Sequence, residues 1–184
     1  MQKKLILDQD LLEITISRLC YQLIENHNDF SDSAILGLQP RGKFVADRIH
    51  AKLESLVKGK IKIGYLDTTF HRDDFRRRET PKQANETTIP FLIEDKKIVL
   101  VDDVLFTGRS VRAALDAMIS FGRPRNVELL VLIDRKYTRD LPIQPNYIGK
   151  SVNTIQSQRV MVEWREQGKS KDSIWLFNNL KRDD

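Results

Sequence analysis

Residues 98–110 read Ile98-Val99-Leu100-Val101-Asp102-Asp103-Val104-Leu105-Phe106-Thr107-Gly108-Arg109-Ser110. The four leading apolar residues predict a buried strand that ends at the two aspartates. Thr107, Gly108 and Ser110 then predict a loop that enters a helix over residues 108–121. In open α/β sheets, ligands bind beyond the carboxyl ends of the strands, and a helix N-terminus presents unpaired N–H groups to anions. The stretch therefore predicts a phosphate-binding loop.

The rest of the chain alternates between strand and helix patterns. Apolar runs predict strands over residues 34–38, 61–66, 98–101 and 127–133. Apolar residues three and four positions apart predict helices over residues 11–26 and 42–57, the first capped by Asp8 or Asp10. The alternation favours an α/β fold with a parallel sheet flanked by helices. After Asp134 the pattern weakens, and only short strands over residues 160–164 and 174–177 are expected, at an edge or in a small cap.

The composition bounds the class of protein. The chain has 184 residues, of which 40% are hydrophobic and 31% charged, and this suits one globular domain over residues 1–184. No apolar run approaches the roughly 18 residues of a membrane span, and no secretory signal is expected. The one cysteine, Cys20, fits a reducing cytoplasm. A net charge of +5 allows an anionic ligand or RNA and requires neither.

The paired acids beside the phosphate loop need their own explanation, because carboxylates repel phosphate. Adjacent ribose hydroxyls fit, since Asp102 and Asp103 can accept hydrogen bonds from them and can favour a developing positive charge on the sugar. A Mg²⁺-bound ligand would soften the repulsion further. An Asp-Asp pair alone is more often a solvent-facing turn, but the whole thirteen-residue arrangement favours a binding site.

A long connection between two predicted strands spans residues 70–90. It has two prolines, few apolar residues, and the basic residues Arg72, Arg76, Arg77, Arg78 and Lys82. A connection this long inside a compact domain is either functional or disordered. Two interpretations stay open: a solvated hairpin tip, and a flexible lid that closes over a charged substrate.

Residues 98–110 resemble the phosphoribosyl diphosphate (PRPP) signature of the type I phosphoribosyltransferases. The wider chain resembles the PyrR family, in order from about Leu5 to Val162. The similar segments are 67–74, 102–114, 122–124, 132–135, 141–143 and 147–150. PyrR proteins attenuate pyrimidine operons through RNA and also have uracil phosphoribosyltransferase activity. The resemblance implies the type I phosphoribosyltransferase fold, with a small hood built from the N- and C-terminal segments, and a homo-oligomer, either a dimer or a tetramer.

The resemblance implies that uracil and PRPP give UMP and pyrophosphate, with Mg²⁺ carried by PRPP and no direct protein ligand to the metal. It gives catalytic roles to Arg41, Asp102 and Asp103: the acids would hold the ribose hydroxyls, and Arg41 would pair with the diphosphate. The residues implied to contact PRPP are Pro40, Arg41, Gly42, Asp102, Asp103, Val104, Leu105, Phe106, Thr107, Gly108, Arg109 and Ser110. Pro40 stands where the family often has threonine.

The resemblance also implies residues for the nucleobase, the lid and RNA. Asp134, Arg135 and Val160 match positions near the nucleobase, although residues 136–140 differ from the Gly-His-Arg-Glu of many relatives. Arg72 and Lys82 are the lid residues implied to contact the diphosphate. Arg18, Arg139 and Lys150 match positions on a face that would bind an mRNA leader. The first helix has Tyr21 and Asn26 where relatives often carry histidine and arginine, and fewer positive groups weaken phosphate contacts.

Three functions therefore stay open at this point. The first is a cytoplasmic uracil phosphoribosyltransferase that also regulates pyrimidine genes. The second is a regulator that senses UMP and binds RNA without useful turnover. The third is a purine phosphoribosyltransferase, because the PRPP segment is shared and only the nucleobase end distinguishes the substrates.

Overall fold

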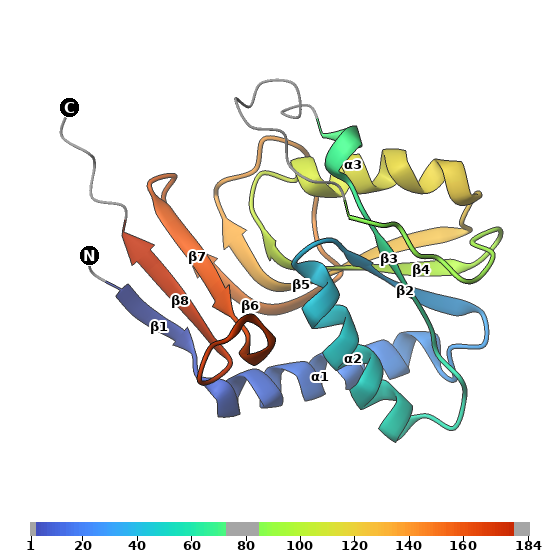
Figure 1. Ribbon diagram of the computed structural model, residues 1–184, viewed down its shortest axis with the longest axis horizontal. Helices are drawn as coiled ribbons and strands as arrows, with labels where there is room; N and C mark the ends of the chain where they lie inside the picture. Colours follow the sequence, from blue (N-terminus) through green and yellow to red (C-terminus); the bar gives the residue numbers. More distant parts are fainter. Residues whose placement is uncertain (1–2, 73–84, 179–184) are drawn as a thin grey trace.

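The computed structural model describes residues 3–72 and 85–178 (Figure 1). The strands are β1 Lys3–Leu7, β2 Ser33–Leu38, β3 Lys62–Leu66, β4 Lys97–Leu105, β5 Asn126–Lys136, β6 Tyr147–Asn153, β7 Gln158–Glu163 and β8 Ser173–Asn178. The α-helices are α1 Gln9–His27, α2 Gly42–Leu56 and α3 Arg109–Met118. The 3₁₀ helices are η1 Thr69–His71, η3 Ile119–Phe121 and η4 Arg165–Gln167. None of the helices in these ranges combines the length and the apolar character of a membrane span.

The main sheet has the strand order β3-β2-β4-β5-β6, and all of its strands are parallel. Helices cover both faces of it (Figure 1). Residues on alternate positions of β4 explain why: Val99 and Val101 pack in the core with α1 and α2, while Ile98 and Leu100 pack in the core with α3. A strand buried on both faces must be apolar throughout, and this confirms the prediction of a central parallel strand.

The predicted helices and strands are confirmed, with β4 and β5 longer than expected. The helix predicted over residues 108–121 becomes a 3₁₀ helix after Met118, and strand β1 was not predicted. The side chain of Asp8 caps α1 by accepting a hydrogen bond from the Leu11 N–H at 2.9 Å. β4 continues through Leu105, and β5 through Lys136, because the two strands stay paired beyond the apolar run. The sequence pattern predicted no strand over β6. This edge strand is largely exposed, so it lacks the apolar run that marked the others.

A second, three-stranded sheet forms the hood, in the order β1-β8-β7, with antiparallel pairing. It joins the N-terminal and C-terminal segments, which lie side by side in Figure 1. Arg48 of α2 holds the hood to the main body. Its guanidinium donates to Glu166 at 2.9 Å and Asp172 at 2.7 Å, and stacks over the Trp164 ring at 4.1 Å. The expected small cap is therefore a separate sheet held by long-range contacts.

A buried polar cluster surrounds His27 at the end of α1. The His27 Nδ1 atom lies 2.8 Å from Ser33 Oγ, and Nε2 lies 3.1 Å from Glu128 Oε2. The Tyr147 hydroxyl donates to the same Glu128 oxygen at 2.6 Å. Burial lowers the pKa of His27, and the Glu128 carboxylate opposes this shift. The neutral imidazole is therefore the form that suits the folded chain.

We expect the protein to lose stability as the pH falls below about 6.5. The pKa of His27 is lower in the folded chain than in the unfolded chain, so the unfolded chain takes up the proton first. Until the folded pKa is reached, the free energy of unfolding falls by up to about 1.4 kcal/mol per pH unit. Denaturant titrations between about pH 7.5 and pH 5.5 measure the slope, and His27→Gln should flatten it. Equal slopes in the two proteins would contradict this assignment.

Candidate active site

The loops that follow β2, β4 and β5 meet at the carboxyl ends of the strands. Arg41, after β2, lies with its Nη1 atom 3.7 Å from Asp103 Oδ2 in β4. Arg139, after β5, donates to the carbonyl of Phe106, after β4, at 2.6 Å. Strands β2, β4 and β5 are neighbours in a parallel sheet, so the loops at their carboxyl ends lie together. Ligands bind at this edge of open α/β sheets, and the phosphate loop was predicted there.

The acid pair lies in the last part of β4. Asp103 is 5% exposed, and its Oδ1 atom accepts a hydrogen bond from the Val104 N–H at 2.7 Å. Its Oδ2 atom is buried and finds no hydrogen-bond donor in the part of the chain that the structure describes. Asp102 is partly buried and accepts from the Asp103 N–H at 2.9 Å. The Asp103 Oδ2 atom faces the Arg41 guanidinium at 3.7 Å without a hydrogen bond, so it can still accept a hydrogen bond from a ligand.

Burial raises the pKa of both carboxyl groups of the acid pair. Burial and the neighbouring Asp103 carboxylate raise the pKa of Asp102 well above its usual range. Burial also raises the pKa of Asp103, and the Arg41 guanidinium opposes this shift. A cationic partner between the two acids would lower both pKa values and hold the pair ionised. The pair is thus arranged to receive positive charge.

Gly42 begins α2 directly against the acid pair. A Cβ atom at Gly42 would lie 2.3 Å from the carbonyl oxygen of Val101 and 3.0 Å from the Cα atom of Asp102. No side chain fits there, so glycine lets α2 start in contact with β4. The Gln39–Pro40 peptide bond that precedes this turn is cis. Gly42 is thus placed beside Asp102, and Arg41 beside Asp103.

The segment predicted to bind phosphate divides into the end of β4 and a loop over residues 106–110, which we call the phosphate loop. Val104 and Leu105 belong to β4, where they pair with Ile133 and Asp134. Gly108 has a φ of 91°, in the left-handed region that favours glycine, and α3 begins at the next residue. The first turn of α3 therefore follows the loop directly, with its unpaired N–H groups at the carboxyl end of β4.

The nucleobase residues lie at the end of β5 and in the hood. Arg135 is 5% exposed; its Nε atom donates to Thr154 Oγ1 at 2.9 Å, and Nη2 donates to the carbonyls of Ile155, before β7, and Gln158, the first residue of β7. Its guanidinium also stacks on the Phe106 ring at 3.9 Å. Asp134 is buried and paired with Arg139, and Val160 is half-buried in β7. Most of the Arg135 donors are therefore used to hold the wall of the site.

The ends of the predicted lid converge on Asp67. Its Oδ1 atom accepts from the Thr69 hydroxyl at 2.8 Å, and Oδ2 accepts from the Asn85 N–H at 3.2 Å. Arg72 donates to Ser110 Oγ at 2.9 Å, which brings this lid residue to the phosphate loop. Lys82, the other lid residue implied to contact the diphosphate, lies outside the described residues. One buried carboxylate thus anchors both ends of the 70–90 connection.

We expect Asp67→Asn to loosen both anchors of this connection. The amide offers one acceptor oxygen in place of two, so either the Thr69 or the Asn85 bond is lost. A hydrogen bond to a charged group contributes about 1.5–3 kcal/mol, so amide exchange at Thr69 or Asn85 should quicken at least about tenfold. Hydrogen exchange measures this effect. Asp32→Asn, at an exposed carboxylate, is the control, and equal exchange in both variants would contradict the anchoring role.

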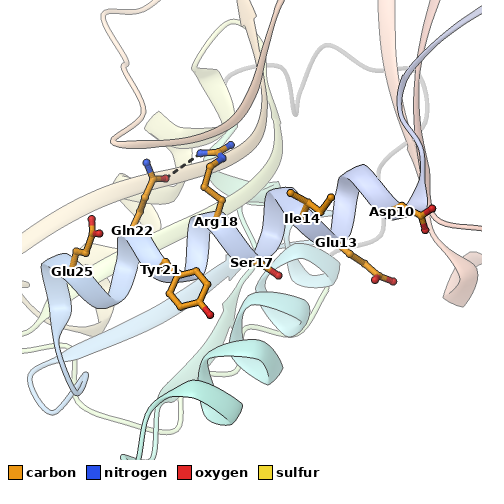
Figure 2. A pocket seen from close by; sticks show the side chains of 8 residues that line it. All are labelled: Asp10, Glu13, Ile14, Ser17, Arg18, Tyr21, Gln22 and Glu25. Carbon is orange, nitrogen blue, oxygen red and sulfur yellow. Dashed lines mark hydrogen bonds between the residues drawn. The ribbon is translucent and has the colours of Figure 1, made fainter.

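Arg18, one of the three residues implied for RNA, projects from α1. Figure 2 shows its side chain on the same side of the helix as that of Gln22, to which it donates a hydrogen bond. It lies in a groove of about 760 Å³ whose other lining residues are Asp10, Glu13, Ile14, Ser17, Tyr21, Gln22 and Glu25. The Arg18 guanidinium also donates to the carbonyls of Ile148 and Gly149. Three carboxylates share the groove with this guanidinium, so its surroundings within one chain are of mixed charge.

The other two residues implied for RNA are bonded within the chain. Lys150 Nζ donates to the Ile6 carbonyl at 3.1 Å and so joins β6 to β1. The Arg139 side chain is 23% exposed and bonds to Asp134 and to four backbone carbonyls. Its donors point into the protein. These bonds could not be predicted from the sequence, because the carbonyl partners depend on the tertiary fold.

Comparison with known proteins shows the family of this chain. A model of the phosphoribosyl transferase domain matches residues 3–167. The chain is 38% identical over 167 residues to the bifunctional protein PyrR of Enterococcus faecalis, covering 91% of this chain and 93% of that protein. It is 35% identical over 180 residues to the bifunctional protein PyrR of Bacillus subtilis, covering 97% and 98%. The chain belongs to the PyrR family. The family resemblance and the phosphoribosyltransferase fold predicted from the sequence are thus confirmed.

Solved structures agree with the PyrR assignment at the level of the fold. A hypoxanthine phosphoribosyltransferase from Staphylococcus aureus matches with a TM-score of 0.70 and 17% identity, covering 97% of this chain and 93% of that chain. A hypoxanthine-guanine phosphoribosyltransferase from Bacillus anthracis matches with a TM-score of 0.66 and 14% identity, covering 95% and 98%. At such identities the likeness concerns the fold alone. It does not favour a purine substrate for this PyrR-family chain.

Proposed function

We propose that this PyrR-family protein transfers the phosphoribosyl group of PRPP to uracil and forms UMP and pyrophosphate. The observation that carries the proposal is the buried acid pair, which lies between the Arg41 guanidinium and the start of α3. This arrangement offers three kinds of contact along one edge of the sheet. It has donors for a phosphate, acceptors for hydroxyls and a cation for a second anionic group.

Each part of PRPP then has a partner of matching chemistry. The 5′-phosphate would bind the N–H groups and hydroxyls of the 106–110 loop, where α3 begins. The ribose hydroxyls would donate to Asp102 and to the Oδ2 atom of Asp103. The diphosphate would face Arg41, which is half exposed at the start of α2.

The transfer needs charge stabilisation more than a protein base. The bond between C1′ and the diphosphate oxygen breaks, and its electron pair leaves with pyrophosphate. Uracil N1 forms the new bond to C1′ and loses its proton. Asp102 and Asp103 would favour the positive charge that develops on the ribose, and Arg41 would neutralise the leaving group. The hood and the lid would keep water away from the cationic sugar.

Mg²⁺ is the cation that we propose for this reaction, carried by the diphosphate of PRPP. No group of three or more His, Cys, Asp or Glu side chains in residues 3–72 and 85–178 is placed to hold a metal. Two neighbouring carboxylates with raised pKa values nevertheless fit an approaching cation. When bound, Mg²⁺ would supply charge neutralisation for the leaving diphosphate.

The test is UMP formation from PRPP and Mg²⁺ with a panel of bases: uracil, hypoxanthine, guanine and orotate. We expect turnover with uracil alone. Turnover with a purine base would overturn the choice of substrate and keep the reaction type. Tight binding of UMP or PRPP without turnover for any base would favour the non-catalytic regulator. Asp134, Arg135 and Val160 remain the proposed nucleobase residues, the first two through backbone groups that leave their side-chain bonds intact.

A second function, the regulation of pyrimidine genes through an mRNA leader, is proposed because the relatives are named bifunctional. UMP would act as the effector by binding the RNA-competent form more tightly. The oligomer proposed for this role is a dimer or a tetramer in the cytoplasm. A salt titration of RNA binding with and without UMP tests the role, and light scattering measures the oligomer. RNA affinity that UMP leaves unchanged would count against regulation.

A further inference from the structure

The Arg139 side chain makes several hydrogen bonds near the phosphate loop. It lies in the segment after β5. Its Nη1 atom donates to the carbonyls of Phe106 at 2.6 Å and Arg135 at 3.0 Å, and lies 3.4 Å from that of Leu105. Its Nε atom donates to the Ile143 carbonyl at 3.0 Å, and Nη2 donates to the Asp134 carboxylate. One guanidinium thus joins the end of β4 to the end of β5.

The two residues after Arg139 continue the same contact. The N–H groups of Asp140 and Leu141 donate to the Thr107 carbonyl at 3.0 and 3.2 Å. Asp140 also accepts a hydrogen bond from Arg109 Nε at 3.1 Å. The 139–141 segment therefore binds successive carbonyls of the phosphate loop from one side.

These carbonyl contacts fix the direction of the loop N–H groups. In a trans peptide the C=O and N–H bonds point in opposite directions. Since the carbonyls of Phe106 and Thr107 face the 139–141 segment, the N–H groups of Thr107 and Gly108 face away from it. Those are the donors that would meet the 5′-phosphate.

We propose that Arg139 is a positioning residue for PRPP: it orients the phosphate loop and sets its distance from the nucleobase end of the site. The proposal rests on the proposed function and deepens it. Only arginine suits the position, because a planar guanidinium presents five N–H donors in a fixed geometry, whereas lysine has three on one atom. Lysine would keep the charge beside Asp134 and lose most of the carbonyl contacts.

The test compares Arg139→Lys and Arg139→Gln with Arg48→Gln. Arg48 is a matched control, since it is a similarly buried arginine with carboxylate, carbonyl and ring contacts, and it lies in the hood attachment. For each variant we would measure the PRPP dissociation constant by calorimetry, KM and kcat with uracil, and Tm. Both Arg139 variants should weaken PRPP binding and raise the KM for PRPP by about tenfold or more. Arg139→Lys should therefore not restore the wild-type values. Arg48→Gln should lower Tm and leave PRPP binding unchanged.

Other outcomes overturn the proposal in distinguishable ways. An unchanged PRPP affinity with a lowered Tm would make Arg139 a purely structural residue. An unchanged PRPP affinity with weaker binding of a labelled single-stranded RNA would make it an RNA contact. If Arg139→Gln does not fold, Arg139→Lys carries the measurement. If the wild type binds PRPP but makes no UMP, the proposed transferase function fails, and the binding constants still decide the role of Arg139.

Discussion

Asp103→Asn is expected to lower kcat by about 10²–10³-fold, the usual effect of removing one charge-stabilising group, while the folded protein becomes no less stable. The asparagine keeps the Oδ1 acceptor for the Val104 N–H, so the backbone of β4 is undisturbed. What it removes is the negative charge that faces the ribose. Steady-state kinetics with PRPP and uracil measure the loss.

The stability half of this prediction follows from the pKa of Asp103. Burial raises that pKa in the folded chain above its value in the unfolded chain. Holding the Asp103 carboxylate ionised therefore costs the folded chain free energy, and an uncharged amide removes this cost. Asp116→Asn, at an exposed carboxylate paired with Arg112, is the control and should change neither kcat nor Tm. An Asp103→Asn protein with full activity would show that the acid does not act on the reacting sugar.

Gly42→Ala is expected to cause a similarly large loss, by a steric route. The new methyl group would lie 2.3 Å from the Val101 carbonyl oxygen, so either α2 or β4 must move. Overpacking of this kind costs about 1–3 kcal/mol of stability. Because Arg41 and Asp103 sit on the two elements that separate, a misplacement of about 1 Å between them can cost about 10²-fold in turnover.

The measurements for Gly42→Ala are kcat/KM for PRPP and Tm. Both should fall, and the activity measured on the folded protein should fall by at least about 10²-fold. Lys52→Ala serves as the control, because Lys52 lies on an exposed position of the same helix. A Gly42→Ala protein with wild-type kcat/KM would contradict the close approach of α2 to the acid pair.

The central sheet and the position of the phosphate loop could be predicted from the sequence because both depend on local pattern. A short, wholly apolar run in an alternating strand and helix pattern indicates a central parallel strand, and the strand predicted over residues 98–101 was confirmed within β4. The loop predicted at Thr107, Gly108 and Ser110 likewise lies directly before α3, with Gly108 in the left-handed region. Strand ends were less predictable. The polar residues Asp102 and Asp103 were expected to end the strand, but β4 continues through them because it stays paired with β5.

The contacts that complete the candidate site could not be predicted from local pattern. Arg135 and Arg139 look like surface residues in the sequence, yet each bonds to backbone carbonyls that only the tertiary fold supplies. Asp67 looks like the end of a strand, and its role as an anchor depends on Asn85 returning from a distant loop. Arg135, Arg139 and Asp67 thus differ from surface residues of the same types in the distant groups that they bond, and the local sequence does not show those groups.

The pairing of β1 with β8 has a consequence for synthesis of the chain. Lys3 pairs with Phe177, so β1 cannot pair until the ribosome has added about 170 further residues. At about 5–20 residues per second, that delay is roughly 10–35 s on the ribosome. The parallel sheet can form from nearer neighbours during this time, because short loops close at the lowest entropic cost. The hood is therefore the last part to assemble, and a nascent chain holds a phosphate loop before it holds a covered active site.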